Sequence, residues 1–557
     1  MRPGPDALWL TDGVSMRALV LALILLFCSA GISMAAPWRI TKDHWSEADE
    51  EGFAKFVQAI GESDCNSTER CLHSAANPWY DPKESLGDLD TDCAKLPYLL
   101  RGYYAWKNGL PFSYVNGVSG RGGDLRYTSG NHSVSRLDLI DDGGGFNGPS
   151  ALRVMIGNVF SGTYRTDAGS DEKVPSDFYS PAITPKAIRP GTVIYDVNGH
   201  VAIAYKVDED GRIYYMDAHP DFTVSRSVYG AQFGQSRVGL GGGLKKWRPQ
   251  TLIGARRDKA GFFIGGHIVL TPNAKIPDFS LVQYVGTEPN PAGDVANARF
   301  AYNNTPLGFY EFVRVAVSGG KMEFNPVYEL QTTMRTLCND LKDRAQFVSM
   351  AFSENIASRF HPTRLPNNIY GTDDDEWETY STPSRDARLK TAFAQFYHDM
   401  GEMMSLYVKR DERIVYDGYD LKADLASAYT REANACIVSY TNSESRPVAM
   451  NFDAMAKRLF AMSFDPYNCI ELRWGATGAE AASCKDPQIK RRWYEAEQRL
   501  RNQIDRPYDV TMNFTLDDLA RAAPHSGTDT PPPIDVRALI ESTGPRVAFQ
   551  GMAPIGR

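Results

Sequence analysis

The chain has 557 residues, of which 43% are hydrophobic, and its formal net charge is −8. The hydrophobic fraction is sufficient for well-packed cores, and the length indicates two or more domains. An acidic balance excludes the basic surface on which nucleic-acid binding depends, so we expect no nucleic-acid partner.

The N-terminus has the features of an export signal. Met16 and Arg17 precede an apolar run over residues 18–28, and small residues then lead to a cleavage site near Ala35. A basic start, a short apolar core and a small-residue exit are typical of a cleaved signal peptide. We therefore expect an exported, periplasmic or secreted protein, with translation starting at Met1 or Met16. No later run approaches the length of a membrane span, so we expect none in the mature chain.

Two helices are expected in the first part of the mature chain. Apolar residues at helical spacing predict a short helix through Phe53–Ile60 and a second from Leu96 to Lys107, where Asn108-Gly109 ends it. Residues 116–148, which are rich in Gly, Ser, Asn and Asp, follow this second helix. Because the fold has to continue beyond them, we interpret them as a long insertion or lid within one domain.

Residues 190–219 carry the strongest strand signal. Three runs rich in strand-forming residues, 193–197, 200–207 and 212–218, are separated by Asn198-Gly199 and by an acidic turn ending in Gly211. Turns of this type between strand-like runs predict a three-stranded antiparallel meander.

The sequence becomes mainly helical after about residue 260. Apolar stripes at helical spacing run through residues 330–348 and 393–407, and residues 486–502 resemble a charged helix. Methionine-rich stripes of this kind are more often core than cofactor-binding segments. We therefore expect a first domain over residues 36–260, a mainly helical domain over 261–525 and a flexible tail over 526–557.

The cysteines leave one thiol without a partner. The chain has eight cysteines and Cys28 lies in the signal, so seven remain in the mature protein. Exported proteins usually pair their cysteines. Short sequence separations favour two of the pairs, and the third joins the two cysteines that remain in helix-like stretches: Cys65–Cys71, Cys469–Cys484 and Cys338–Cys436. The unpaired residue is then Cys93, in an acidic loop that leads into the second helix.

Cys93 is the candidate nucleophile. A helix N-terminus and a protonated histidine both lower the pKa of a thiol, and Cys93 precedes a helix. His200 directly follows the Asn198-Gly199 turn, and the small residues Ala202 and Ala204 on its strand face leave room for the helix that carries Cys93. An inert core thiol and an ordinary histidine after a turn are the alternative interpretations.

A third polar group is expected to orient the imidazole of His200. Asp217 and His219 share one face of the next strand, so either side chain is within reach of the far ring nitrogen. Asp217 is the better candidate because it lies opposite His200 in a hairpin pairing, and because a carboxylate also stabilises the imidazolium that forms.

The motifs around these residues resemble a known family. Asp92-Cys93 at a helix start, Pro190-Gly191-Thr192-Val193-Ile194-Tyr195, and Gly199-His200-Val201-Ala202-Ile203 are similar to NlpC-type papain-like cysteine hydrolases over about residues 76–225. The resemblance implies an α+β papain-like domain with a Cys-His dyad and a third polar residue, here Asp217. It also implies cleavage of amide bonds in peptidoglycan stem peptides, with Tyr80 and the Cys93 backbone N–H binding the oxyanion.

The sequence departs from the family pattern and leaves other functions open. Ala94-Lys95 follow the cysteine where the family usually has Ser-Gly, and the separation between Cys93 and His200 is about twice the usual one. One alternative is a catalytically silent binding or scaffold module whose helical half docks a cell-envelope partner. Another is a transglutaminase-like acyl transferase. No metal or organic cofactor is expected: His73 lies near Cys71, but no second Cys/His pair occurs at zinc-binding spacing.

Overall fold

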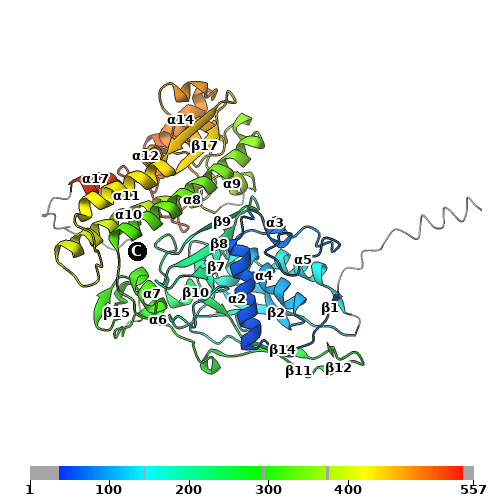
Figure 1. The fold of residues 1–557 in the computed structure, drawn as a ribbon. Coiled ribbons are helices and arrows are strands. Elements are labelled where there is room, and N and C mark those ends of the chain that lie inside the picture. Colours follow the sequence, from blue (N-terminus) through cyan, green and yellow to red (C-terminus); the bar gives the residue numbers. More distant parts are fainter. Residues whose placement is uncertain (1–36, 144, 292, 294, 372–374, 543–557) are drawn as a thin grey trace, which may run out of the picture.

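The computed structural model describes residues 37–542 except 144, 292, 294 and 372–374 (Figure 1). The predicted export signal lies outside the described residues. Helices and antiparallel sheets are combined within one chain, which confirms the α+β class. Among the described helices, none has the length and apolar character needed to cross a bilayer.

A six-stranded antiparallel sheet forms the centre of the first half of the chain. Its spatial order is β5-β10-β6-β7-β8-β9. The strands are β5 (Phe178–Tyr179), β6 (Val193–Asp196), β7 (His200–Val207), β8 (Ile213–Ala218), β9 (Val224–Val228) and β10 (Gly243–Trp247). The predicted meander corresponds to β6, β7 and β8. Its turns place Gly199 at φ +84° and Gly211 at φ +81°, which only glycine adopts without strain.

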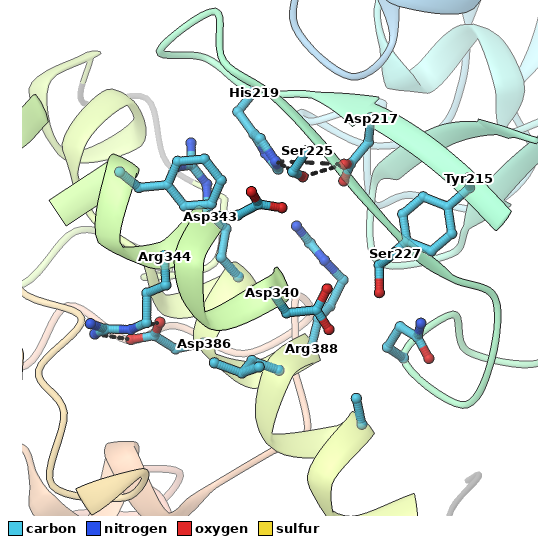
Figure 2. A pocket seen from close by; sticks show the side chains of 15 residues that line it. Tyr215, Asp217, His219, Ser225, Ser227, Asp340, Asp343, Arg344, Asp386 and Arg388 are labelled. Atoms are coloured by element: carbon cyan, nitrogen blue, oxygen red, sulfur yellow. Dashed lines mark hydrogen bonds and ion pairs between the residues drawn. The ribbon is translucent and has the colours of Figure 1, made fainter. Parts of the chain in front are cut away.

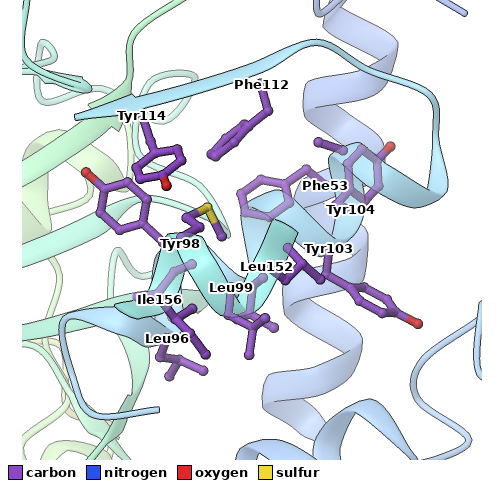
Figure 3. Packing of buried hydrophobic residues seen from close by; sticks show 14 of the residues in the cluster. Phe53, Leu96, Tyr98, Leu99, Tyr103, Tyr104, Phe112, Tyr114, Leu152 and Ile156 are labelled. Carbon is purple, nitrogen blue, oxygen red and sulfur yellow. The ribbon is translucent and has the colours of Figure 1, made fainter. Parts of the chain in front are cut away.

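Helices cover both faces of this sheet. The helices α2 (Glu47–Glu62) and α4 (Lys95–Lys107) share one core with Val201 and Ile203 of β7. Figure 3 shows aromatic and aliphatic side chains of this core packed together. The helix α7 (Phe309–Val317) packs on the opposite face, against Ala202 and Ala204. The expectation that these two alanines face the Cys93 helix is therefore wrong, because their small side chains accommodate α7.

Smaller elements surround the sheet. The glycine-rich insertion contains most of a hairpin formed by β2 (Phe112–Ser119) and β3 (His132–Leu139). The other small elements of this half are β1 (Pro37–Trp38), α3 (Thr68–Leu72), β4 (Phe146–Asn147), α5 (Gly148–Asn158), β11 (Gln250–Ile253), β12 (Arg256–Arg257), β13 (Phe263–Ile264), β14 (His267–Leu270), α6 (Val282–Val285), β15 (Phe300–Tyr302) and β16 (Thr305–Leu307).

The second half is mainly helical and has its own cores. Its main elements are α8 (Pro326–Ser353), α9 (Asp375–Tyr380), α10 (Pro383–Val408), α11 (Leu421–Ala435), β17 (Ile437–Thr441), β18 (Pro447–Asn451), α12 (Phe452–Arg458), α13 (Ile470–Arg473), α14 (Gln488–Ala496), α15 (Gln498–Asn502), α16 (Leu516–Ala520) and α17 (Val536–Ser542). Apolar side chains of α8, α10, α11 and α12 form its largest cluster.

Two of the predicted domain limits need correction. Because α7 packs on the sheet, the first domain extends to about residue 320 and the helical half begins with α8. Val536, Leu539 and Ile540 of α17 are buried in the helical core. Residues 536–542 of the predicted flexible tail are therefore packed, because the apolar face of α17 closes one side of that core.

Buried ion pairs join the two halves. Glu329 of α8 accepts hydrogen bonds from Arg212 at 2.7 Å and from Arg314 at 2.8 Å. Two further pairs, Arg385–Asp221 at 2.8 Å and Arg506–Asp196 at 2.9 Å, link residues after α9 to the sheet half. Removing one partner of a buried pair leaves an uncompensated charge and typically costs about 3–5 kcal/mol. The sheet half and the helical half are therefore held together by interactions that are costly to break.

The three predicted disulfides are confirmed. Cys65 bonds to Cys71, Cys338 to Cys436 and Cys469 to Cys484, which leaves Cys93 as the free cysteine of the described residues. The Cys338–Cys436 bridge ties α8 to the end of α11, whereas Cys65–Cys71 closes a short loop after α2. Stable disulfides are typical of proteins in oxidising compartments.

We expect the two kinds of bridge to contribute unequally to stability. The cysteines of Cys338–Cys436 are 98 residues apart, and those of Cys65–Cys71 are six apart. Loop-closure entropy then predicts losses of about 4.7 and about 2.2 kcal/mol when each pair is replaced by alanine. Urea denaturation of the two double variants measures this difference. Equal losses, or a larger loss for Cys65–Cys71, would contradict it.

Candidate active site

Cys93 lies at the beginning of α4. Asp92 Oδ1 accepts hydrogen bonds from the backbone N–H groups of Ala94 and Lys95, at 3.0 and 3.1 Å, and so caps the helix. Cys93 packs against the first core with intermediate exposure. The backbone N–H of Val201 faces the Cys93 sulfur and favours its anionic form. The Cys93 thiol therefore lies next to Val201, which directly follows His200 in β7.

His200 and Asp217 form a close, buried pair. His200 Nε2 lies 2.5 Å from Asp217 Oδ2, and both residues are buried. Because a carboxylate can only accept, Nε2 carries the proton and Nδ1 is left with a lone pair in the neutral ring. The arrangement fixes the tautomer that a general base requires.

The pairing between the two strands is diagonal. The ladder pairs Ile203 with Met216 and Ala204 with Tyr215, so its continuation brings His200 level with His219. The two imidazole rings stack with centroids 5.9 Å apart. Asp217 is thus reached diagonally and not directly across, which corrects the predicted register and leaves the predicted contact intact.

Ser225 extends this arrangement to β9. It is the cross-strand partner of Asp217, and its Oγ lies 2.5 Å from Asp217 Oδ1 and 2.9 Å from His219 Nε2. His219 Nε2 itself is 3.7 Å from Asp217 Oδ1, beyond hydrogen-bond distance. Asp217 therefore contacts His200, and His219 contacts Ser225.

The helical half covers the side of the site on which Asp217 lies. Figure 2 shows residues of α8 and α10 facing Asp217, His219 and Ser225. The pocket between them has a volume of about 60 Å³ and is lined by Asp340, Asp343 and Arg388, together with the residues of β8 and β9. This volume holds a few water molecules and no peptide. Its lining does not include Cys93, so a substrate has to approach the thiol from another side.

The environments of the Cys93 thiol and of the His200 imidazole both favour the neutral form. Burial around the sulfur raises the pKa of the Cys93 thiol to about 12, and the adjacent Asp92 carboxylate adds to the rise. Burial also lowers the pKa of His200, and the Arg388 guanidinium adds to that effect. The expected lowering of the thiol pKa by a helix start and a histidine is therefore outweighed by burial in this structure.

Asp217 remains ionised within this environment. Burial works against its ionisation, but the His219 and His200 rings and the Arg388 cation hold the pKa of the carboxyl below its usual range. Burial and the Arg385 cation lower the pKa of His219. The buried negative charge of Asp217 thus lies near two imidazoles and faces Arg388 from the other half.

Tyr80 lies in a separate environment. It is 40% exposed, and its ring contacts that of His73 with centroids 5.5 Å apart. Among the interactions of the described residues, Tyr80 makes none with Cys93, His200 or Asp217. The oxyanion role of Tyr80 remains a prediction from the family resemblance.

Residues that the sequence analysis missed complete the site. Ser225 belongs to β9, whose alternating Val-Ser-Arg-Ser-Val pattern follows directly after the predicted meander. Tyr164, which is fully buried, donates a hydrogen bond of 2.6 Å from its hydroxyl to the Ala94 carbonyl, next to Cys93. Arg388 comes from α10, and no local pattern connects it to the strands. Comparison of the chain with models of protein families, with curated proteins and with solved structures gives no match.

We expect the thiol of Cys93 to react slowly with alkylating reagents near neutral pH. Only the thiolate reacts, so a pKa of about 12 predicts a rate that rises about tenfold per pH unit between about pH 7 and pH 10 without levelling off. Iodoacetamide labelling followed by peptide mapping measures this rate, and the Cys93→Ser variant is the control. A plateau near the ordinary cysteine pKa, or labelling of another cysteine, would contradict the assignment.

We expect Arg388 and Arg385 to act on different histidines. Loss of a nearby cation makes protonation easier, so Arg388→Gln should raise the pKa of His200 and Arg385→Gln should raise that of His219. Titration of histidine-labelled protein by NMR measures both rings. If Arg388→Gln leaves His200 unchanged, the helical half does not tune the site.

Proposed function

We propose that this protein is an exported thiol hydrolase that cleaves amide bonds, with the NlpC-type papain-like fold that its motifs resemble. The observation that carries the proposal is the buried His200–Asp217 pair. The backbone N–H of Val201, the residue after His200, faces the sulfur of the free cysteine Cys93. Peptidoglycan stem peptides are the substrate class that the resemblance implies. The three disulfides fit a periplasmic or secreted location.

The proposed reaction begins with proton transfer inside the enzyme. His200 Nδ1 takes the Cys93 proton as sulfur attacks the amide carbonyl, and Asp217 stabilises the imidazolium that forms. The oxyanion accepts a hydrogen bond from the Cys93 backbone N–H, which has no intrahelical partner because it lies at a helix start. The family resemblance implies a second hydrogen bond from the Tyr80 hydroxyl. Since a neutral Cys93 and a neutral His200 precede attack, His200 acts as a general base and no preformed ion pair is needed.

The cycle then closes with water. His200 returns its proton to the leaving amine, the carbon–nitrogen bond breaks, and an acyl group remains on Cys93 sulfur. Water, deprotonated by His200 Nδ1, attacks this thioester and releases a carboxylic acid and the Cys93 thiol. An added amine in place of water would give the acyl-transfer reaction of a transglutaminase-like enzyme.

A catalytically silent binding module is the second candidate. The observation that favours it is the high pKa of the Cys93 thiol, which leaves almost no thiolate at neutral pH. In that case the papain-like half and the helical half would together form a scaffold for a cell-envelope partner. The two candidates differ in whether amide cleavage depends on Cys93.

We expect Asp217→Asn to reduce turnover on the order of a thousandfold or more, because the amide can present a donor where the His200 N–H needs an acceptor. The assay incubates peptidoglycan stem peptides, and casein as a general substrate, and follows new amines and carboxylates by mass spectrometry. Cys93→Ser should abolish release, whereas His219→Asn should have a much smaller effect.

The same assay separates the candidates. No release from either substrate, or equal release by Cys93→Ser, would contradict the hydrolase proposal and leave the binding module. Addition of glycine amide to the reaction tests acyl transfer, because its nitrogen then appears in the product. Near-normal turnover in Asp217→Asn would remove Asp217 from the mechanism.

A further inference from the structure

A second group of buried polar side chains lies in the helical half. The donor atoms of His361, Asp465 and Glu497 all lie within 4.8 Å of one another. Asp465 and Glu497 are 0% exposed, and the His361 side chain is 1% exposed. They come from the loop after α8, the loop after α12 and the end of α14, three segments that are separate in sequence.

The carboxylate of Glu497 accepts no hydrogen bond from the described residues. Both of its carboxylate oxygens are buried and unbonded among the interactions of the described residues. Its closest cation, Arg501, has Nη1 3.9 Å from Glu497 Oε2, beyond hydrogen-bond distance. A fully buried carboxylate without a donor is costly, because nothing replaces the water it has lost.

The arginines around Glu497 direct their donors elsewhere. Arg501 donates to the Tyr494 carbonyl at 2.6 Å and to Gln498 at 2.8 Å. Arg473 donates to the Ser463 carbonyl at 3.0 Å and to Thr382 at 3.2 Å. The guanidinium groups of Arg501 and Arg473 thus lie near Glu497 without donating a hydrogen bond to its carboxylate oxygens.

His361 has the orientation of a ligand. Its Nδ1 lies 2.6 Å from the Pro362 carbonyl, which can only accept, so Nδ1 carries a proton. The neutral ring then presents the bare Nε2 lone pair, which lies 2.9 Å from the acceptor atom Oδ2 of Asp465. Two acceptor atoms, His361 Nε2 and Asp465 Oδ2, are stable at this distance only if a metal ion or a proton lies between them. A backbone carbonyl bonded to the second nitrogen is the usual way to fix a metal-binding histidine.

We propose that His361, Asp465 and Glu497 bind a divalent metal ion, with zinc as the ion that this donor set fits best. One imidazole and two carboxylates are typical zinc ligands, and both oxygens of Glu497 are available for a fourth contact. Ligands at about 2.1 Å from one ion lie about 3.4 Å apart in a tetrahedron, so small side-chain movements complete the site. Among the described residues the other group of this kind includes Cys469 and Cys484, whose sulfurs form a disulfide.

The burial of the site indicates a structural role. The ion would fasten three segments around His361, whose ring stacks on Trp493 with centroids 4.2 Å apart. Metal binding to a site that exists only in the folded chain stabilises that fold. The proposed metal site is independent of the hydrolase function, since neither Cys93 nor His200 belongs to the cluster.

The test measures zinc in the full-length protein, purified without a metal-affinity column. After incubation with zinc chloride and gel filtration, we expect inductively coupled plasma mass spectrometry to find about one zinc ion per chain. A strong chelator should lower the melting temperature by about 5–10 °C, and added zinc should restore it. No stoichiometric zinc, together with no response to the chelator, would overturn the proposal and leave a protonated Glu497 beside a His361–Asp465 ion pair.

Variants locate the ion within the protein. Glu497→Gln keeps the shape of the side chain, and we expect it to lose the zinc and the response to chelator; Asp465→Asn should do the same. The matched control is Asp386→Asn, a buried acid of the same half that pairs with Arg344 at 2.8 Å and should retain the zinc. Retention of zinc by both cluster variants would show that it binds elsewhere and would overturn the site.

Discussion

The ionised carboxylate of Asp217 is the constraint on which the candidate site depends. A carboxylate buried in a protein is stable only where hydrogen bonds and cations replace the water it has lost. Its hydrogen-bond partners are His200 of β7 and Ser225 of β9, which lie on the two strands next to β8. The nearby cation is Arg388 of α10. The sheet supplies the hydrogen bonds and the helical half supplies the positive charge. The site is therefore a property of the assembled molecule and not of the sheet half alone.

The same physical rule applies in the helical half. Beside its apolar core, this half encloses charged groups that are paired with one another, such as Arg344 with Asp386. Buried charges of this kind contribute little net stability, but they are intolerant of a missing partner. This intolerance makes Glu497 informative, because the carboxylates of Glu329, Asp217 and Asp386 each have a hydrogen-bond donor. The carboxylate of Glu497 has none among the described residues.

Local patterns in the sequence were sufficient for much of the fold. The period-2 runs and glycine turns gave β6, β7 and β8, helical spacing gave α4, α8 and α10, and cysteine spacing gave two disulfides, with the third following from the two cysteines that remained. The contact between His200 and Asp217 was also predictable, because it needs only strand alternation and an adjacent hairpin. The face on which α4 packs was not predictable, since Ala202 and Ala204 fit any close neighbour. The roles of Arg388 and α7 depend on contacts between distant parts of the chain, which no local pattern encodes.

The pairing of Arg385 with Asp221 across the two halves has an evolutionary consequence. The two residues are 164 positions apart in the chain, yet their side chains form one buried ion pair. A substitution at either position alone would leave a charge stranded in the interior, so tolerated changes have to occur together. Exchange of the helical half for an unrelated domain by recombination near residue 320 would therefore leave Asp221 buried without its cation. Inheritance of the two halves as one unit keeps this pair intact, and residues 221 and 385 should co-vary in lineages that retain both halves.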